Sequence, residues 1–226
     1  MSPQDSLTIR PVRSDEYSAA GELIVEAYRS LGDVEAADYL EKLRDVAARA
    51  PMGEVLVADM GGQLVGCVTY VDGQTALSEG DDPDAGSIRM LGVSKHARGR
   101  GVGEALVAAC IDRAVASGRQ RVRLTTRTTM KSAQRIYERF GFRRDPDYDR
   151  STTHGMKLMG YVLDLDSATR RLAVTRVCGA NAGIEGAPKS IEQGALHVEG
   201  PLPIGRGPSE RREGEMRGRP TLQNRS

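Results

Sequence analysis

The chain has 226 residues, which is enough for one domain with a sizeable hydrophobic core and too few for two domains of full size. Its 32 Lys and Arg residues nearly balance 31 Asp and Glu residues, so no overall field would draw it to nucleic acid or to an anionic membrane. No apolar run approaches the roughly 18 residues that a membrane-spanning helix needs, and the first residues lack the pattern of a secretory signal. We therefore expect a cytoplasmic protein.

The first part of the sequence predicts one strand, two helices and a hairpin. Leu7–Val12 alternates apolar and polar residues, and Asp15–Arg29 has an acidic first turn followed by apolar residues at helical spacing. A second helix is expected over Val34–Ala50. Two segments rich in β-branched residues, Glu54–Asp59 and Gln63–Tyr70, flank a pair of glycines, which predicts a hairpin.

After a polar loop, the second part of the sequence predicts strands that alternate with helices. In chain order these are a strand at 87–93, a helix at 103–117, a strand at 122–126, a helix at 131–139 and a strand at 156–165. Gly118 and Gly141 follow the two helices, at the position where a left-handed residue commonly ends a helix.

The order of these elements, β-α-α-β-β-β-α-β-α-β, combines an antiparallel meander with two crossover helices. We therefore expect an α/β (α+β) fold, a mixed and mostly antiparallel twisted sheet flanked by helices, in a domain of residues 1–168. From Arg170 onward the chain has five of its ten prolines and no aromatic residue. Because that stretch buries too little apolar surface to offset its ordering entropy, residues 169–226 are expected to be a disordered tail, or alternatively an arginine-rich interaction segment.

A glycine-rich turn, Arg98-Gly-Arg-Gly-Val-Gly-Glu104, lies between the strand that ends near Val93 and the helix that begins near Gly103. Glycines allow the backbone to turn tightly and to approach a ligand closely. The first turn of a helix presents unpaired N–H groups and the positive end of the helix dipole, which together favour phosphate. The turn therefore indicates a phosphate site, although a simple connection between strand and helix is the plainer alternative.

Two other phosphate motifs do not fit this turn. A Walker A loop requires the run GxxxxGK[ST], which the sequence lacks. The dinucleotide-binding fingerprint GxGxxG requires a glycine where this chain has Glu104. The functions of a P-loop ATPase and of a Rossmann dehydrogenase therefore lose support.

The remaining pattern, [RQ]xxGxG after a strand, resembles the GCN5-related N-acetyltransferase (GNAT) superfamily over roughly residues 7–165. The resemblance implies that the turn wraps the pyrophosphate of acetyl-CoA with backbone donors. It also implies a sheet that is splayed at the central cofactor strand, whose main chain pairs with the pantetheine arm. The implied cofactor-binding residues are Leu91, Gly92, Val93, Arg98, Gly99, Arg100, Gly101, Val102, Gly103 and Glu104.

A second segment, Ala133–Phe142, resembles the A-x-x-x-Y-x-x-x-G-F helix and turn of the same family. There the tyrosine protonates the sulfur of the departing CoA, which implies that Tyr137 is the catalytic acid. A phenol ordinarily titrates near pH 10, so it is protonated at neutral pH and can donate. Without the motif, a single tyrosine in a helix would be taken as a core residue.

The general base is not identified from the sequence. Thr125 and Met130 stand where some protein-acetylating relatives carry a glutamate and an asparagine, so those two roles are not transferred. The acidic run Glu79–Asp84 would concentrate a cationic amine if it faced the acceptor. Otherwise it is a solvated loop.

The expected activity is transfer of the acetyl group of acetyl-CoA, bound as a co-substrate, to a primary amine of a small molecule or peptide by direct attack. An acyl-CoA-sensing module without efficient chemistry is the alternative from another class. No metal site is expected, because His96 and His154 have no partners at ligand spacing. Cys67, Cys110 and Cys178 contain no CxxC pair and are expected to be reduced packing residues.

The partner is expected to be an amine-bearing acceptor, most simply a small molecule, and neither nucleic acid nor a membrane. Arginines that could contact nucleic acid lie on several elements, which disfavours that function. They are at positions 119, 121, 123, 127, 135 and 139. The sequence is compatible with a homodimer and does not fix the oligomeric state.

Overall fold

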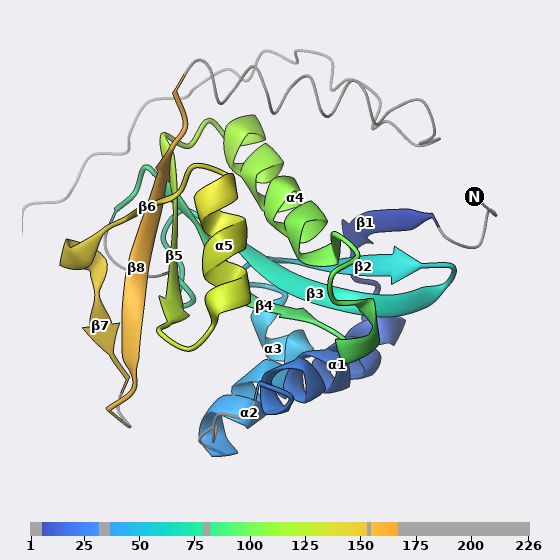
Figure 1. Cartoon of the computed structure of the whole chain (residues 1–226). Coiled ribbons are helices and arrows are strands. Elements are labelled where there is room, and N and C mark those ends of the chain that lie inside the picture. Colours follow the sequence, from blue (N-terminus) through green and yellow to red (C-terminus); the bar gives the residue numbers. More distant parts are fainter. Residues whose placement is uncertain (1–5, 32–36, 79–81, 153–154, 167–226) are drawn as a thin grey trace, which may run out of the picture. The chain divides into compact units, whose positions relative to one another are not determined.

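The computed structural model describes residues 6–31, 37–78, 82–152 and 155–166, so the expected tail lies outside the described residues. Within these ranges eight strands form one sheet in the order β1-β2-β3-β4-β5-β8-β6, and β7 pairs with β8 (Figure 1). Only the neighbours β4 and β5 run parallel, and the other pairs run antiparallel. The expectation of a mixed, mostly antiparallel sheet is confirmed.

The strands and helices lie close to the predicted segments. The strands are β1 (Leu7–Pro11), β2 (Glu54–Met60), β3 (Gln63–Asp72), β4 (Ala85–Val93), β5 (Arg121–Arg127), β6 (Arg143–Arg144), β7 (Arg150–Ser151) and β8 (Lys157–Asp164). The helices are α1 (Tyr17–Arg29), α2 (Ala37–Arg44), α3 (Val46–Arg49), α4 (Val102–Ala116) and α5 (Lys131–Arg139), with short 3-10 turns η2 (Ser14–Glu16), η3 (Lys95–Ala97) and η4 (Pro146–Tyr148). None of the helices in the described ranges has the length and apolar character needed to cross a membrane.

The expectation of one helix over residues 34–50 is wrong, because α2 and α3 are separated at Asp45. Asp45 has a ψ of 78°, outside the helical range, and its Oδ1 accepts a hydrogen bond of 2.9 Å from the N–H of Ala48. An aspartate in this position caps the start of a new helix, and its backbone ends the preceding one. Arg49, which is 2% exposed, donates from Nη1 to the carbonyl of Lys42 at 3.1 Å and so completes the end of α2.

Helices lie on both faces of the sheet, α4 and α5 on one and α1, α2 and α3 on the other (Figure 1). A hydrophobic core lies between the sheet and each set of helices. Because successive side chains of a strand point to opposite faces, neighbouring residues of β2 belong to different cores. Leu56 and Ala58 pack with α4 and α5, whereas Val55 and Val57 pack with α1, α2 and α3. Both faces of the sheet are therefore covered, and a ligand that reaches its centre must enter where strands separate.

The two helices α4 and α5 end as the sequence predicts, with Gly118 at φ 72° and Gly141 at φ 85°. After α5, the N–H of Gly141 donates to the carbonyl of Glu138 and the N–H of Phe142 donates to that of Tyr137, both at 3.0 Å. This is the pattern of a Schellman motif, which folds the residue after the glycine onto the helix. The ring centroids of Phe142 and Tyr137 are accordingly 5.8 Å apart. The Y-x-x-x-G-F pattern therefore ends the helix and packs these two rings together, whether or not the tyrosine is catalytic.

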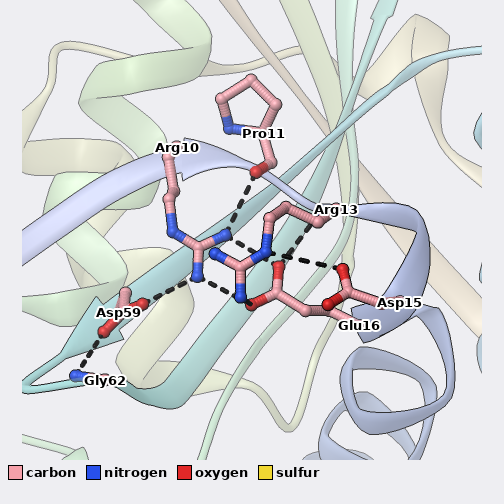
Figure 2. Close-up of polar contacts among 7 residues, drawn as sticks. All are labelled: Arg10, Pro11, Arg13, Asp15, Glu16, Asp59 and Gly62. Carbon is pink, nitrogen blue, oxygen red and sulfur yellow. Dashed lines mark hydrogen bonds and ion pairs between the residues drawn. The ribbon is translucent and has the colours of Figure 1, made fainter.

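A cluster of charged side chains holds the N-terminal strand in place (Figure 2). Arg10 of β1 donates to Glu16 at 2.8 Å from each terminal nitrogen and to Asp59 of β2 at 2.7 Å. Arg13 also pairs with Glu16 at 2.6 Å. The hydrogen bonds from Arg10 hold the pKa of Glu16 at about 2, below its ordinary value of 4.5. The cluster therefore joins β1, η2 and β2 by charge rather than by apolar packing.

Candidate active site

The two central strands β4 and β5 separate after a short pairing (Figure 1). Their parallel register joins Ala85–Ser87 to Arg121–Arg123, and β4 then continues to Val93 without a register partner on β5. The N–H and C=O groups along that edge of β4 are therefore free of ladder bonds to β5. The sheet is splayed at the strand for which the sequence resemblance implied it.

A β-bulge in β4 lies where the strands separate. The register with β3 shifts between Cys67 and Thr69, so Met90 and Leu91 of β4 face the single residue Val68. Met90 has a φ of 53°, a value that residues other than glycine rarely adopt. A bulge bends its strand and increases the local twist, which turns the end of β4 away from β5.

Helix α1 packs closely against the splayed strand because residue 92 is a glycine. A Cβ at Gly92 would lie 2.6 Å from Cδ1 of Ile24 and 3.0 Å from Cβ of Ala27. The close approach brings the end of α1, with Ala27, Tyr28 and the following Leu31, to the opening between the strands.

The turn between β4 and α4 has the backbone geometry that suits an anion. Gly99 and Gly101 have φ values of 75° and 80°, and open space surrounds the place of a Cβ at both. The hydrogen bond from the N–H of Ala105 to the carbonyl of Gly101, at 2.9 Å, is the first of helix α4. The amides of residues 102–104 therefore have no acceptor within α4, and they stand at the positive end of its dipole.

The guanidinium of Arg98 is held by hydrogen bonds to other groups of the protein. Its Nε donates to the carbonyl of Val93 at 3.2 Å, and its Nη2 donates to the carbonyl of Ala27 at 3.1 Å and to Oγ of Ser30. The side chain thus joins the end of β4 to the last turn of α1. Its role at a pyrophosphate remains a prediction.

A cavity of about 920 Å³ connects the end of α1, the end of β4, the turn and helix α5. The structure brings together at this cavity most of the residues that the resemblance implied. They are Leu91, Gly92, Val93, Arg98, Gly99, Gly101, Val102, Gly103 and Glu104, whereas Arg100 is not among the lining residues. Their contact with a cofactor stays a prediction.

The wall formed by α5 carries basic side chains that sequence reasoning missed. Lys131, Arg135 and Arg139 are spaced by four residues, so they share one face of the helix, and all three line the cavity. Arg139 also forms an ion pair with Glu104 of α4. In the sequence Arg135 and Arg139 stand out only as candidate nucleic-acid contacts, although their spacing already predicts a common face.

Tyr137 lies on the other side of α5, in the core. It is 5% exposed, and its ring centroid is 6.0 Å from that of Tyr161 and 5.8 Å from that of Phe142. Its neighbours Ile136 and Glu138 line the cavity, and Tyr137 is not among the lining residues. The ring therefore packs as that of a core tyrosine, and its role as catalytic acid stays a prediction.

Thr125 and Met130 stand where some relatives carry a glutamate and an asparagine, and neither side chain can act as a general base. Oγ1 of Thr125 accepts a hydrogen bond of 3.3 Å from Arg150 of β7. Met130 lines the cavity just before α5, and its sulfur accepts from the hydroxyl of Thr126 at 3.7 Å. The base therefore stays unidentified.

The described part of the acidic loop lies at the opposite end of β4 from the glycine turn. Asp82 pairs with Arg121 at 3.2 Å and with Arg123 at 3.6 Å, just before β4 begins. Its single negative charge is therefore shared between two arginines of β5. Residues 79–81 lie outside the described residues.

The cysteines and histidines considered in the sequence analysis show no arrangement that indicates catalysis or metal binding within the described residues. Burial raises the pKa of the Cys67 and Cys110 thiols, which keeps both protonated at neutral pH. Nε2 of His96 lies 3.3 Å from Oγ of Ser94. Cys178 and His154 lie outside the described residues. In the part of the chain that the structure describes, no group of three or more His, Cys, Asp or Glu side chains is placed to hold a metal ion.

Comparison with known sequences identifies relatives of the chain. The sequence model of the acetyltransferase (GNAT) family matches residues 18–142. Over 100 residues the chain is 32% identical to N-acetylaspartate synthetase from Danio rerio, an alignment that covers 44% of this chain and 33% of that protein. The chain thus matches only about a third of the length of this relative.

Comparison with solved structures shows the same fold in several bacterial proteins. A GNAT-family acetyltransferase from Staphylococcus aureus Mu50 has a TM-score of 0.58 at 17% identity, covering 71% of this chain and 100% of that one. The protein yncA from Salmonella typhimurium, with its cofactor acetyl-CoA, has a TM-score of 0.55 at 19% identity, covering 72% and 96%. The ribosomal-protein-S18-alanine N-acetyltransferase from Escherichia coli has a TM-score of 0.54 at 16% identity, covering 71% and 95%.

These structural likenesses establish the fold, and the family match extends over more than half of the chain, from α1 through the glycine turn to the end of the α5 motif. The chain belongs to the GNAT family of acetyltransferases.

Proposed function

We propose that the protein transfers the acetyl group of acetyl-CoA to a primary amine by direct attack in a ternary complex. The observation that carries this proposal is a single cavity that joins the unpaired edge of β4 to the amides at the start of α4. A free strand edge can pair with the amides of a pantetheine arm, and the start of a helix can hold a diphosphate. These two features suit the pantetheine arm and the diphosphate of an acyl-CoA molecule.

The surroundings of the turn support this fit. At Gly99 and Gly101 the space that a side chain would fill is open, so a ligand can approach the backbone closely. Leu91, Gly92 and Val93 line the same cavity and would hold the pantetheine arm through their main chain. The proposal includes no metal ion.

The chemistry requires one new bond and one broken bond. The acceptor nitrogen bonds to the acetyl carbon, the carbon–sulfur bond breaks, and the nitrogen passes a proton to water or to a base that is not identified. The departing sulfur takes a proton from an acid, a role we assign to the hydroxyl of Tyr137. Packing against Phe142 and Tyr161 fixes the orientation of this ring.

The acceptor is proposed to be a small molecule that bears an amine. The name of the Danio rerio relative, N-acetylaspartate synthetase, points to an acetylated amino acid as the product of that protein. Amino acids therefore belong among the first acceptors to test, beside polyamines, aminoglycosides and short peptides.

A second function, acyl-CoA sensing without efficient catalysis, is favoured by one observation. Tyr137 is only 5% exposed and is not among the residues that line the cavity. If that burial persists when cofactor is bound, the departing sulfur has no donor from this residue, and binding would occur with little turnover.

The experiment that separates these functions measures thiol release from acetyl-CoA against a panel of amines, together with the affinity for CoA. We expect release with at least one acceptor and a loss of about a hundredfold in turnover for Tyr137→Phe, the lower range for removal of a general acid. Tyr161→Phe is the matched control, because it removes a hydroxyl from the neighbouring ring of the same core. Both variants keep the packed ring, so we expect folding to be retained, and thermal unfolding checks this.

Three results would change the assignment. Unchanged turnover in Tyr137→Phe would remove this residue from the mechanism. An equal loss in Tyr161→Phe would show that the core, and not one hydroxyl, is responsible. Affinity for CoA without release on any acceptor would favour the sensor.

A further inference from the structure

The positive charge on the α5 wall exceeds what a diphosphate at the glycine turn requires. We call Lys131, Arg135 and Arg139 the α5 basic row. The turn already offers the unpaired amides of residues 102–104 and the positive end of the α4 dipole to a diphosphate. Three further cations facing the same cavity therefore indicate a second anionic group on the ligand.

Arg98 also lines the cavity, but its guanidinium is less available to a ligand because it is hydrogen-bonded within the protein. Arg98 directs its donors to the carbonyls of Val93 and Ala27 and to the hydroxyl of Ser30. The α5 basic row is thus the main source of positive side-chain charge for a ligand in this cavity. It spans eight residues, which is about 12 Å of helix at 1.5 Å per residue, so it extends well beyond a single phosphate.

The pair between Arg139 and Glu104 shows how part of this charge is held before a ligand arrives. Glu104 lies in the first turn of α4, where the helix dipole stabilises a carboxylate, and it contacts Arg139. The side chains are 41% and 63% exposed. An ion pair with this exposure is weak and is readily exchanged for a stronger anion.

A phosphate monoester is such an anion. It carries nearly two negative charges at neutral pH, whereas each phosphate of a diphosphate bridge carries one, and an arginine fork can bind it through two hydrogen bonds. In CoA the monoester is the phosphate on the ribose, and dephospho-CoA differs from CoA by that group alone.

We propose that the α5 basic row binds the ribose phosphate of CoA, so that the protein selects CoA over dephospho-CoA, and that Glu104 holds Arg139 until this phosphate replaces it. The proposal deepens the proposed function and rests on it, because it assumes that CoA occupies the cavity. It assigns the row to specificity for the co-substrate and gives it no part in the chemical step.

The test is the dissociation constant of CoA and of dephospho-CoA, each measured by titration calorimetry on the full chain. We expect the wild type to bind CoA at least tenfold more tightly. Arg135→Gln and Arg139→Gln should each weaken CoA binding about five- to tenfold, the size of one charge-assisted contact at an exposed site, and leave dephospho-CoA binding nearly unchanged. Lys131→Gln should act in the same direction with a smaller factor, because an ammonium lacks the fork.

Arg143→Gln is a matched control for Arg139→Gln. The Arg143 side chain is 65% exposed against 63% for Arg139, and it too pairs with one carboxylate, that of Asp164, at 2.6 Å. It is not among the residues that line the cavity, so its loss should leave both affinities unchanged. Glu104→Gln should tighten CoA binding a few fold and leave dephospho-CoA nearly unaffected, because it releases Arg139.

Equal affinity of the wild type for the two compounds would overturn the proposal. So would an equal loss of both affinities in the α5 variants, since the row would then serve the diphosphate. If the wild type binds neither compound, the proposed function itself fails, and this inference fails with it.

Discussion

The two walls of the cavity are built on different physical principles. The turn from Arg98 to Glu104 presents main-chain amides, which its glycines leave accessible and its place before α4 orients. The wall formed by α5 acts through charged side chains on a short helix. The first wall therefore depends on backbone conformation and tolerates changes of charge, whereas the second tolerates changes of backbone detail and depends on charge.

The two walls also meet. A Cβ at Gly103 would lie 3.0 Å from Cδ1 of Ile136, so the third glycine of the turn allows α4 to approach α5. The ion pair between Glu104 and Arg139 joins the same two helices one residue further along the chain. If the proposed binding of CoA is correct, the contrast teaches that a backbone wall can hold the diphosphate while an exchangeable charged wall holds the ribose phosphate.

The largest effect is expected from breaking the backbone wall. Gly101→Ala places a side chain at φ 80°, which costs about 1–2 kcal/mol of stability, and puts a methyl group into the open space where we propose that CoA binds. We expect the affinity for CoA to fall at least tenfold, since each 1.4 kcal/mol of lost binding free energy is a factor of ten. Calorimetry gives the affinity, and thermal unfolding gives the stability.

Gly62→Ala separates strain from binding in this test. Gly62 has a φ of 86° and equally open surroundings, but it lies in the turn between β2 and β3. Both variants should lose similar stability, and only Gly101→Ala should lose affinity. If Gly62→Ala weakens CoA binding as much, the backbone of the Arg98–Glu104 turn has no special role.

An intermediate effect is expected from salt, which distinguishes the two walls without mutation. Raising the salt concentration from 0.05 to 0.5 M should increase the KM for acetyl-CoA about three- to tenfold, because contacts between exposed charges are screened. In Arg135→Gln the increase should be clearly smaller, since part of the screened wall is already gone. An identical salt dependence in the two proteins would place the salt-sensitive contacts elsewhere.

The smallest effect is expected at Glu16 (Figure 2), which is not among the residues that line the cavity. Hydrogen bonds from Arg10 lower the pKa of Glu16 from 4.5 to about 2. Because the folded state lowers this pKa, the stabilisation is complete above pH 4.5 and is lost as the pH falls toward 2. Glu16→Gln should therefore cost about 1 kcal/mol at pH 7, and the difference from wild type should shrink below pH 4.

Thermal unfolding across this pH range measures the effect, with Asp15→Asn as the control. Asp15 belongs to the same turn, but its side chain is 76% exposed and its pair with Arg13 is long, at 3.5 Å. The affinity for CoA should be unchanged in both variants. A difference between Glu16→Gln and wild type that does not depend on pH would show that the ionised pair is not its source.

Much of the fold followed from local patterns. The helix over Lys131–Arg139 has the predicted bounds, and its end at Gly141 follows from the need for a left-handed residue. The break between α2 and α3 was not predicted, because Asp45 lies within a continuous apolar pattern and only its backbone conformation shows the cap. Strands β6 and β7 have two residues each, too few to show alternation.

The candidate site also has features that the sequence predicted and features that only the structure shows. The glycine turn could be recognised because phosphate binding by main-chain amides requires particular residues at fixed spacing after a strand. The bulge at Met90 could not, since no local pattern marks a residue that adopts a φ of 53° where the strands separate. The location of Tyr137 in the core also required the structure, because a helical tyrosine can turn toward a cavity or away from it.

By itself the sequence determined the order of the longer strands, the ends of α4 and α5 and the place of the glycine-rich turn, because each depends on the conformational preferences of a few neighbouring residues. Only the tertiary structure decided that α5 stands opposite that turn, with Arg139 against Glu104, although 35 residues separate them in the chain. Contacts over such a separation depend on how the helices pack on the sheet, and packing is a property of the whole core.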